Sequence, residues 1–149
     1  MKRSVLLKQF TRDQESLINI LHALQDNNPQ NYLSSDDLKA ASTYLNITYS
    51  HVYGVATYYT MFSLKPRGKY IIRVCNSPVC NMERSVEIIE EIMRQLSIKP
   101  GETSSDERFT LELSECLGQC DIAPGMMINK DVIGNLEVSV IESVLEKYN

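Results

Sequence analysis

The sequence predicts an α/β protein of the α+β type, in which an N-terminal three-helix bundle precedes a domain of order βαβ-ββα. Apolar residues at helical spacing dominate roughly the first sixty positions. Residues 63–68, Ser-Leu-Lys-Pro-Arg-Gly, break that pattern with a proline and a glycine. Alternating apolar residues typical of strands begin directly afterwards. We therefore expect two units, residues 1–64 and residues 65–149.

The first expected helix follows a capping box of Thr11 and Gln14. Pro29 ends it, because proline lacks the N–H group that a helix interior requires. Its apolar stripe consists of Leu17, Ile18, Leu21 and Leu24.

The second expected helix begins at Ser34, which forms a capping box with Asp37. Leu33 and Leu38 occupy the two positions of a hydrophobic staple, which packs the incoming chain against the first turn. From Leu38 onward, an inward-facing stripe predicts packing against the other helices.

The third expected helix begins after Thr48, a residue type that caps helices well, and runs to Phe62. Gly54 lies in its middle, where the missing side chain predicts a close crossing with a neighbouring helix. The apolar face carries Val52, Val55, Ala56, Tyr59 and Phe62.

The second half of the chain predicts strands and helices in alternation. In chain order these are strand 70–74, helix 86–96, strand 109–114, a hairpin of 126–128 and 132–133, and a final helix from residue 138. A strand, a helix and a second strand form a crossover unit with parallel strands. The order βαβ followed by ββα is that of a thioredoxin-like domain.

The four cysteines fall in two pairs, Cys75-x4-Cys80 and Cys116-x3-Cys120. Each pair begins where an expected strand ends, and the ends of parallel strands lie at one edge of a sheet. The two loops are therefore expected to present four thiolates to one metal ion or cluster. A [2Fe-2S] cluster needs two such pairs, one for each iron.

Duller interpretations of the cysteines remain. One zinc ion also accepts four thiolates, although usually from tight loops with two spacers, so zinc is the main alternative. An isolated buried cysteine commonly acts as a small apolar residue. That interpretation does not account for four thiols at two loops. A Cys-x-x-Cys redox pair is absent. Gly118, between Cys116 and Cys120, either lets backbone N–H groups approach sulfur or is a plain turn glycine.

Composition excludes several classes of partner. The net charge of −4, with scattered Lys and Arg, leaves no basic surface, so we expect no nucleic acid. No segment approaches a membrane span, so we expect no direct membrane insertion. The apolar run after Arg3 is too short for a secretory signal, and we expect a cytoplasmic protein. No nucleotide-binding or nucleophile motif appears, so the chain alone is expected to be non-catalytic.

Seven further stretches carry a recognisable pattern, residues 52–62, 69–70, 73–75, 115–120, 121–124, 127–129 and 134–136. With these stretches the chain resembles the thioredoxin-like [2Fe-2S] subunit of NADH dehydrogenases, the small partner of the FMN- and NADH-binding flavoprotein subunit. Residues 76–79, Asn-Ser-Pro-Val, are the one departure, in a loop where members of the family also vary. The resemblance covers nearly the whole chain.

The resemblance implies a [2Fe-2S] cluster on Cys75, Cys80, Cys116 and Cys120. It also implies that FMN and NAD(H) bind the flavoprotein subunit, which the N-terminal helices contact. A further iron-sulfur, hydrogenase or formate dehydrogenase-type subunit is a second expected partner. The thioredoxin-like fold commonly has a cis-proline before its hairpin, so we expect a cis bond at Ala123–Pro124.

Several assemblies use such a subunit. The compact length favours a soluble electron-bifurcating or NAD-linked hydrogenase, or an NADH:ferredoxin oxidoreductase. The alternatives are the peripheral arm of respiratory complex I, an NAD-dependent formate dehydrogenase, and a zinc-stabilised assembly module without a redox role.

Overall fold

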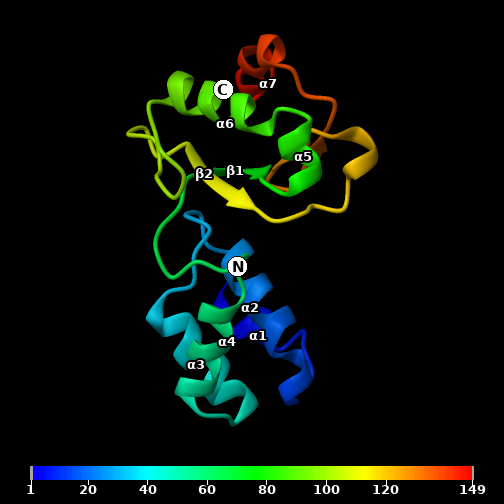
Figure 1. Cartoon of the computed structure of the whole chain (residues 1–149). Coiled ribbons are helices and arrows are strands. Elements are labelled where there is room, and N and C mark those ends of the chain that lie inside the picture. The colour runs from blue at the N-terminus through cyan, green and yellow to red at the C-terminus, as the bar shows by residue number, and fades with distance from the viewer. Residues whose placement is uncertain (1, 149) are drawn as a thin grey trace. The chain divides into compact units, whose positions relative to one another are not determined.

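The structure is a computed structural model that describes residues 2–148. It divides into two compact units, a helical unit that ends at Arg67 and a sheet-containing unit that begins at Gly68 (Figure 1). Each unit has its own cluster of buried apolar side chains. Each therefore has the separate core that a compact domain needs.

Within residues 2–67 the helical unit contains four α-helices and one 3₁₀ turn. They are α1 (Arg3–Leu7), the turn η1 (Gln14–Ser16), α2 (Leu17–Asp26), α3 (Ser35–Leu45) and α4 (Tyr49–Tyr58). Helices α2, α3 and α4 are the three that the sequence predicts, and α1 is an addition. It buries Leu6 and Leu7 in the core that α2 also lines. The bundle therefore gives a short apolar run a surface on which to form a helix.

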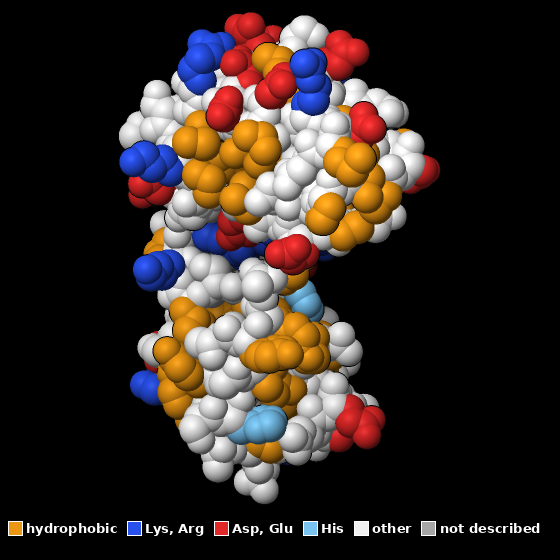
Figure 2. Space-filling model, viewed as in Figure 1, with side chains coloured by type: hydrophobic (Ala, Val, Ile, Leu, Met, Phe, Trp, Pro, Cys, Tyr) orange, Lys and Arg blue, Asp and Glu red, His pale blue; other side chains and the backbone are white. Residues whose placement is uncertain are grey.

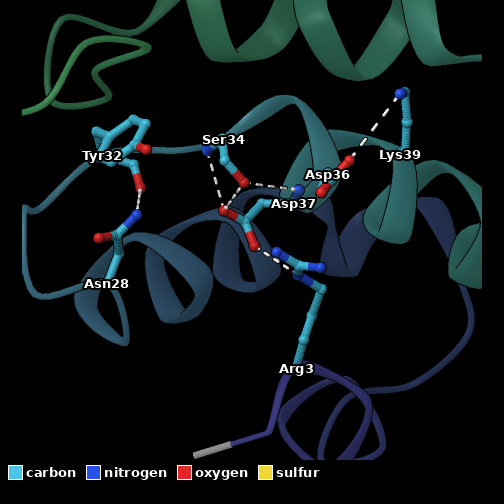
Figure 3. A network of polar contacts seen from close by, with 7 residues as sticks. All are labelled: Arg3, Asn28, Tyr32, Ser34, Asp36, Asp37 and Lys39. Carbon is cyan, nitrogen blue, oxygen red and sulfur yellow. Dashed lines mark hydrogen bonds and ion pairs between the residues drawn. The ribbon is translucent and has the colours of Figure 1, made fainter.

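Helix α3 starts with the capping box that the sequence predicts (Figure 3). The Ser34 hydroxyl accepts a hydrogen bond from the Asp37 N–H at 3.2 Å, and the Asp37 carboxylate accepts one from the Ser34 N–H at 2.9 Å. Arg3 of α1 donates to the other Asp37 oxygen at 2.6 Å. Leu33 and Leu38 are both buried, as a hydrophobic staple requires. One carboxylate thus joins the start of α3 to α1.

The start of α2 differs from the predicted capping box of Thr11 and Gln14. Asp13 is the N-cap of η1, and its side chain accepts a hydrogen bond from the Ser16 N–H at 3.0 Å. The Thr11 hydroxyl lies 2.8 Å from the Ser16 hydroxyl instead. The short Asp13 carboxylate reaches the N–H three residues ahead, which closes a 3₁₀ turn before the α-helix begins.

Helix α4 ends at Tyr58 rather than at the predicted Phe62. Tyr59 is extended, with φ −87° and ψ 119°. The chain then turns so that the Ser63 N–H donates to the side-chain oxygen of Gln25 on α2, at 2.9 Å. Phe62 is buried by this turn. Burial of Phe62 and the Gln25 contact therefore outweigh continuation of the helix.

Within residues 68–148 the chain forms a mixed sheet of four strands in the order β2-β1-β3-β4. The strands are β1 (Tyr70–Cys75), β2 (Phe109–Ser114), β3 (Met126–Ile128) and β4 (Asp131–Ile133). Strands β1 and β2 are parallel, as predicted, and β3 is antiparallel to β1 and β4. The parallel register places Cys75 opposite Ser114 at the shared edge where both strands end.

Helices cover one side of this sheet (Figure 1). The elements other than strands are α5 (Pro78–Met82), α6 (Ser85–Leu96), η2 (Cys120–Ile122), η3 (Val138–Val140) and α7 (Ile141–Glu146). Ile92 of α6 and Ile141 of α7 share a fully buried core with Ile72 of β1 and Leu111 of β2. The Ala123–Pro124 bond, just before β3, is cis, as predicted. The βαβ-ββα order is confirmed.

The glycines differ in what surrounds them. No atom lies within 4 Å of a Cβ built on Gly54, so the predicted close crossing at Gly54 is wrong. The helix face that carries this glycine is open instead. At Gly134 the added Cβ would collide with the Ile122 side chain and lie 2.6 Å from the Ile122 carbonyl oxygen. Ile122 ends η2, which starts at Cys120, so Gly134 supports the cysteine loop.

We expect Gly134→Ala to lower the free energy of unfolding by about 1–3 kcal/mol, because the backbone at Ile122 must move to admit the methyl group. Gly54→Ala is the matched control and should raise it by about 0.5–1 kcal/mol, since alanine favours the interior of a helix. Urea denaturation followed by circular dichroism measures both. Equal stability of Gly134→Ala and the unmodified chain would contradict the close approach.

Candidate metal centre

The four cysteines lie at the carboxyl edge of β1 and β2. Cys75 is the last residue of β1, and Cys80 lies on α5 directly after it. Cys116 follows the end of β2, and Cys120 opens η2. All four are free thiols. Helix α5 is not predicted from the sequence, and it turns the chain so that Cys80 comes back to Cys75.

The thiols are grouped two and two. The Sγ atoms of Cys116 and Cys120 are 3.4 Å apart. The side chains of Cys75 and Cys80 also interact with each other. Among the described residues, no three His, Cys, Asp or Glu side chains converge as a single metal ion would need. The arrangement is thus one of pairs.

The two pairs share one environment. The backbone N–H of Leu117, which follows Cys116, is among the groups that lower the pKa of Cys75. The pKa of Cys120 is raised first by Cys116, and the charges of Cys80 and Cys75 add to the rise. Two loops far apart in sequence thus place the two cysteine pairs at the same edge of the sheet.

One side of the site is buried and the other is open. Cys75 and Cys80 are 2% and 3% exposed, whereas Cys116 and Cys120 are exposed. Burial raises the pKa of Cys80, and Cys75 adds to that rise against a hydrogen bond from the Gly125 N–H. Burial also opposes ionisation of Cys75, but hydrogen bonds outweigh it and lower the pKa of that thiol.

Backbone N–H groups point at the sulfurs. Gly118 has φ +78°, a conformation that glycine adopts without strain, and its N–H donates to Cys116 Sγ at 3.3 Å. This contact is to a cysteine sulfur of the same turn, so it fits both of the roles that the sequence leaves open for Gly118. With the N–H groups of Leu117 and Gly125, the site offers donors that stabilise negative sulfur.

Two serines belong to the site although the sequence alone did not indicate them. The Ser77 hydroxyl lies 3.1 Å from Cys75 Sγ, and both groups are buried. The Ser114 hydroxyl is buried with no hydrogen-bond partner among the described residues. For Ser114 a signal existed, because parallel pairing of the two strands already places it beside Cys75.

The donor set fits a [2Fe-2S] cluster. Four thiols in two pairs match two irons with two cysteine ligands each. The N–H groups and the buried Ser77 hydroxyl supply hydrogen bonds of the kind that iron-sulfur sites use to set potential. The orphaned Ser114 hydroxyl is a buried polar group that a further acceptor at the site would satisfy.

A comparison with known families supports a [2Fe-2S] cluster over the zinc alternative. The profile of the thioredoxin-like [2Fe-2S] ferredoxins matches residues 4–149. The chain belongs to this family. The cofactor of the thioredoxin-like [2Fe-2S] ferredoxins is a [2Fe-2S] cluster, and the resemblance seen in the sequence is confirmed at this level.

Relatives of this ferredoxin include one of the subunits of NADH-quinone oxidoreductase, in two bacteria. The Rickettsia prowazekii (strain Madrid E) protein is 38% identical over 117 residues, which cover 78% of this chain and 66% of the relative. The Escherichia coli (strain K12) protein is 40% identical over 111 residues, 74% of this chain and 67% of the relative. This chain thus spans about two thirds of the length of these relatives.

A solved structure confirms the fold of this ferredoxin. The air-oxidised NAD+-reducing [NiFe]-hydrogenase superposes with a TM-score of 0.80 at 22% identity. The match covers 99% of this chain and 24% of the hydrogenase chain. Among the described residues, no helix has the length and apolar character needed to cross a membrane.

Proposed function

We propose that this ferredoxin is the [2Fe-2S] electron-transfer subunit of a multi-subunit, flavin-dependent NAD(H) oxidoreductase. We further propose that Cys75, Cys80, Cys116 and Cys120 are the ligands of its cluster. The observation that carries both proposals is the grouping of four thiols in two adjacent pairs, in a chain of this family.

The chemistry follows from counting electrons. NADH gives up a hydride, which carries two electrons, whereas a [2Fe-2S] cluster accepts one at a time, so a flavin must split the pair. The described residues hold the cluster in place and set its reduction potential. Buried Cys75 and Cys80 anchor the site, and exposed Cys116 and Cys120 leave one side open to a partner. Glu115 and Asp121 place negative charge beside the thiolates and lower the potential.

A partner subunit is proposed to carry FMN and NAD(H), and to bind the helical unit of this chain. That unit exposes two pairs of tyrosines on α4 and the residue that follows it, Tyr49 with Tyr53 and Tyr58 with Tyr59, and we call these four residues the tyrosine surface. Figure 2 shows hydrophobic side chains gathered on the viewed face of this unit. Exposed apolar patches mark interaction sites, and tyrosine is enriched at protein interfaces. These features support the helical unit as the contact with the flavoprotein.

Two kinds of assembly fit this role. We favour a cytoplasmic electron-bifurcating or NAD-linked hydrogenase, or an NADH:ferredoxin oxidoreductase, in which a further iron-sulfur or hydrogenase-type subunit takes the electron. The names of the curated relatives support the second candidate, the peripheral arm of complex I. Purification of the native assembly and identification of its subunits distinguishes the two.

The isolated chain is expected to show no reaction with NADH, since no nucleotide-binding loop occurs in its sequence. Dithionite should bleach its visible absorbance, which shows that the cluster itself is reducible. After addition of the flavoprotein partner, NADH should produce the same bleaching. Anaerobic absorbance titration measures all three. Reduction of the partner-free chain by NADH would place a nicotinamide site on this chain and refute the division of labour.

A further inference from the structure

Ser77 carries a buried hydroxyl that the fold of α5 does not use. Ser77 is the N-cap of α5, but its side chain makes no capping hydrogen bond. Its Oγ lies instead 3.1 Å from Cys75 Sγ, and Ser77 is only 6% exposed. A cysteine that ligates iron is a thiolate without a proton, so the hydroxyl must be the donor in this contact.

Ser114 carries a second buried hydroxyl on the same face of the sheet. In the parallel register, Cys75 pairs with Ser114 just as Arg73 pairs with Glu112, and paired residues of neighbouring strands point to the same side. The side chains of Arg73 and Glu112 do meet, with an Nε–Oε2 distance of 3.0 Å. The Ser114 hydroxyl is buried beside Cys75, and no described group pairs with it. Buried polar groups almost always have a partner, so this hydroxyl lacks an acceptor that sulfur would supply.

We propose that Ser77 and Ser114 are positioning residues of the redox centre. The Ser77 hydroxyl donates a hydrogen bond to Cys75 Sγ, and the Ser114 hydroxyl donates one to a sulfur atom of the centre beside Cys75. Both hydrogen bonds raise the reduction potential of the centre. This inference rests on the proposed ligand role of the cysteines. One-electron reduction adds one negative charge to the sulfurs and irons of the site. An O–H dipole aimed at sulfur stabilises that added charge, and hydrogen bonds to sulfur are among the factors that set iron-sulfur potentials.

The two serines differ from serines that only stabilise the fold. Ser77→Ala removes no capping bond, so α5 should keep its stability. Ser114→Ala removes an unpaired buried hydroxyl, so the chain without iron should not become less stable. A purely structural role therefore predicts no change in potential from either substitution.

The experiment uses the full chain with its cluster and measures the midpoint potential by anaerobic titration. For Ser77→Ala and for Ser114→Ala, the ratio of reduced to oxidised cluster at a fixed applied potential should fall about tenfold, which is 59 mV for a one-electron couple. Ser77→Thr and Ser114→Thr keep the hydroxyl and should restore the original potential. Ser104→Ala is the matched control, because it removes a buried hydroxyl that bonds to Phe109 and Asp106 rather than to a cysteine.

The outcomes separate this inference from the proposed function. Alanine variants that hold full iron at an unchanged potential overturn the inference and leave the cluster assignment intact. An unmodified chain without iron overturns both. If an alanine variant loses its cluster, threonine and valine replacements are compared, since they share one shape and differ in the hydroxyl. A lower potential or cluster loss with valine alone supports the inference, and equal behaviour of the two contradicts it.

Discussion

Replacing Cys75 with alanine is expected to lower bound iron from about two atoms per chain to almost none. The same result is expected for Cys80, since both thiols are buried and no other cysteine is available to replace them. Plasma emission spectrometry for iron and a colorimetric assay for acid-labile sulfide measure the loss. Met82→Ala is the control, because Met82 is 84% exposed and lies on α5 with Cys80. This variant should keep about two irons and two sulfides.

Serine at Cys116 should act differently, because a serine oxygen at this exposed position can still approach iron. We expect Cys116→Ser to lose the normal visible spectrum while keeping part of its iron. The unmodified chain also tests the zinc alternative. One zinc and no iron per purified chain would refute the cluster assignment, and full iron in the Cys75 variant would refute the ligand assignment.

The sheet and the cysteine pairs could be predicted because their signals are local. Residues Phe109–Ser114 alternate clearly, and the observed β2 has the bounds that the sequence predicts. Each cysteine pair follows a strand, and parallel pairing of the two strands then places both pairs at one edge of the sheet. Ser34 and Asp37 similarly predict the start of α3, because a capping box is a motif of four consecutive residues.

The missed features depend on contacts between distant residues. Helix α1 forms because Leu6 and Leu7 find a core made by other helices. The end of α4 is set by the Gln25 contact to Ser63, which lies 38 positions away. Pro78, at the first turn of α5, was the available signal for that helix. To predict that the Ser114 hydroxyl is buried without a partner, one must know both the strand register and the burial of that atom, and only the structure gives the burial.

Deletion of residues 2–67 is expected to abolish copurification with the flavoprotein partner while the remaining chain keeps its cluster. The second unit has a complete core of its own, drawn from β1, β2, β3, α6 and α7, and all four cysteines lie within it. Circular dichroism and visible absorbance of the residue 68–149 chain test its fold and its cluster. An affinity tag on the partner tests assembly. A truncated chain that still copurifies at the normal ratio would show that the helical unit is not the main contact.

Point variants sharpen this test, because a deletion removes many contacts at once. Tyr58 is 79% exposed and Tyr53 is 45% exposed, so serine at either position should leave the helical unit folded. Val5→Ser is the matched control, since Val5 is also exposed, at 50%, but lies on α1 rather than on the tyrosine surface. Aromatic residues at the centre of interfaces commonly contribute about 2 kcal/mol or more to binding. We therefore expect Tyr53→Ser or Tyr58→Ser to weaken the complex about thirtyfold, by calorimetric titration, and Val5→Ser to leave the affinity unchanged. A loss of affinity with Val5→Ser alone would place the contact on α1 instead.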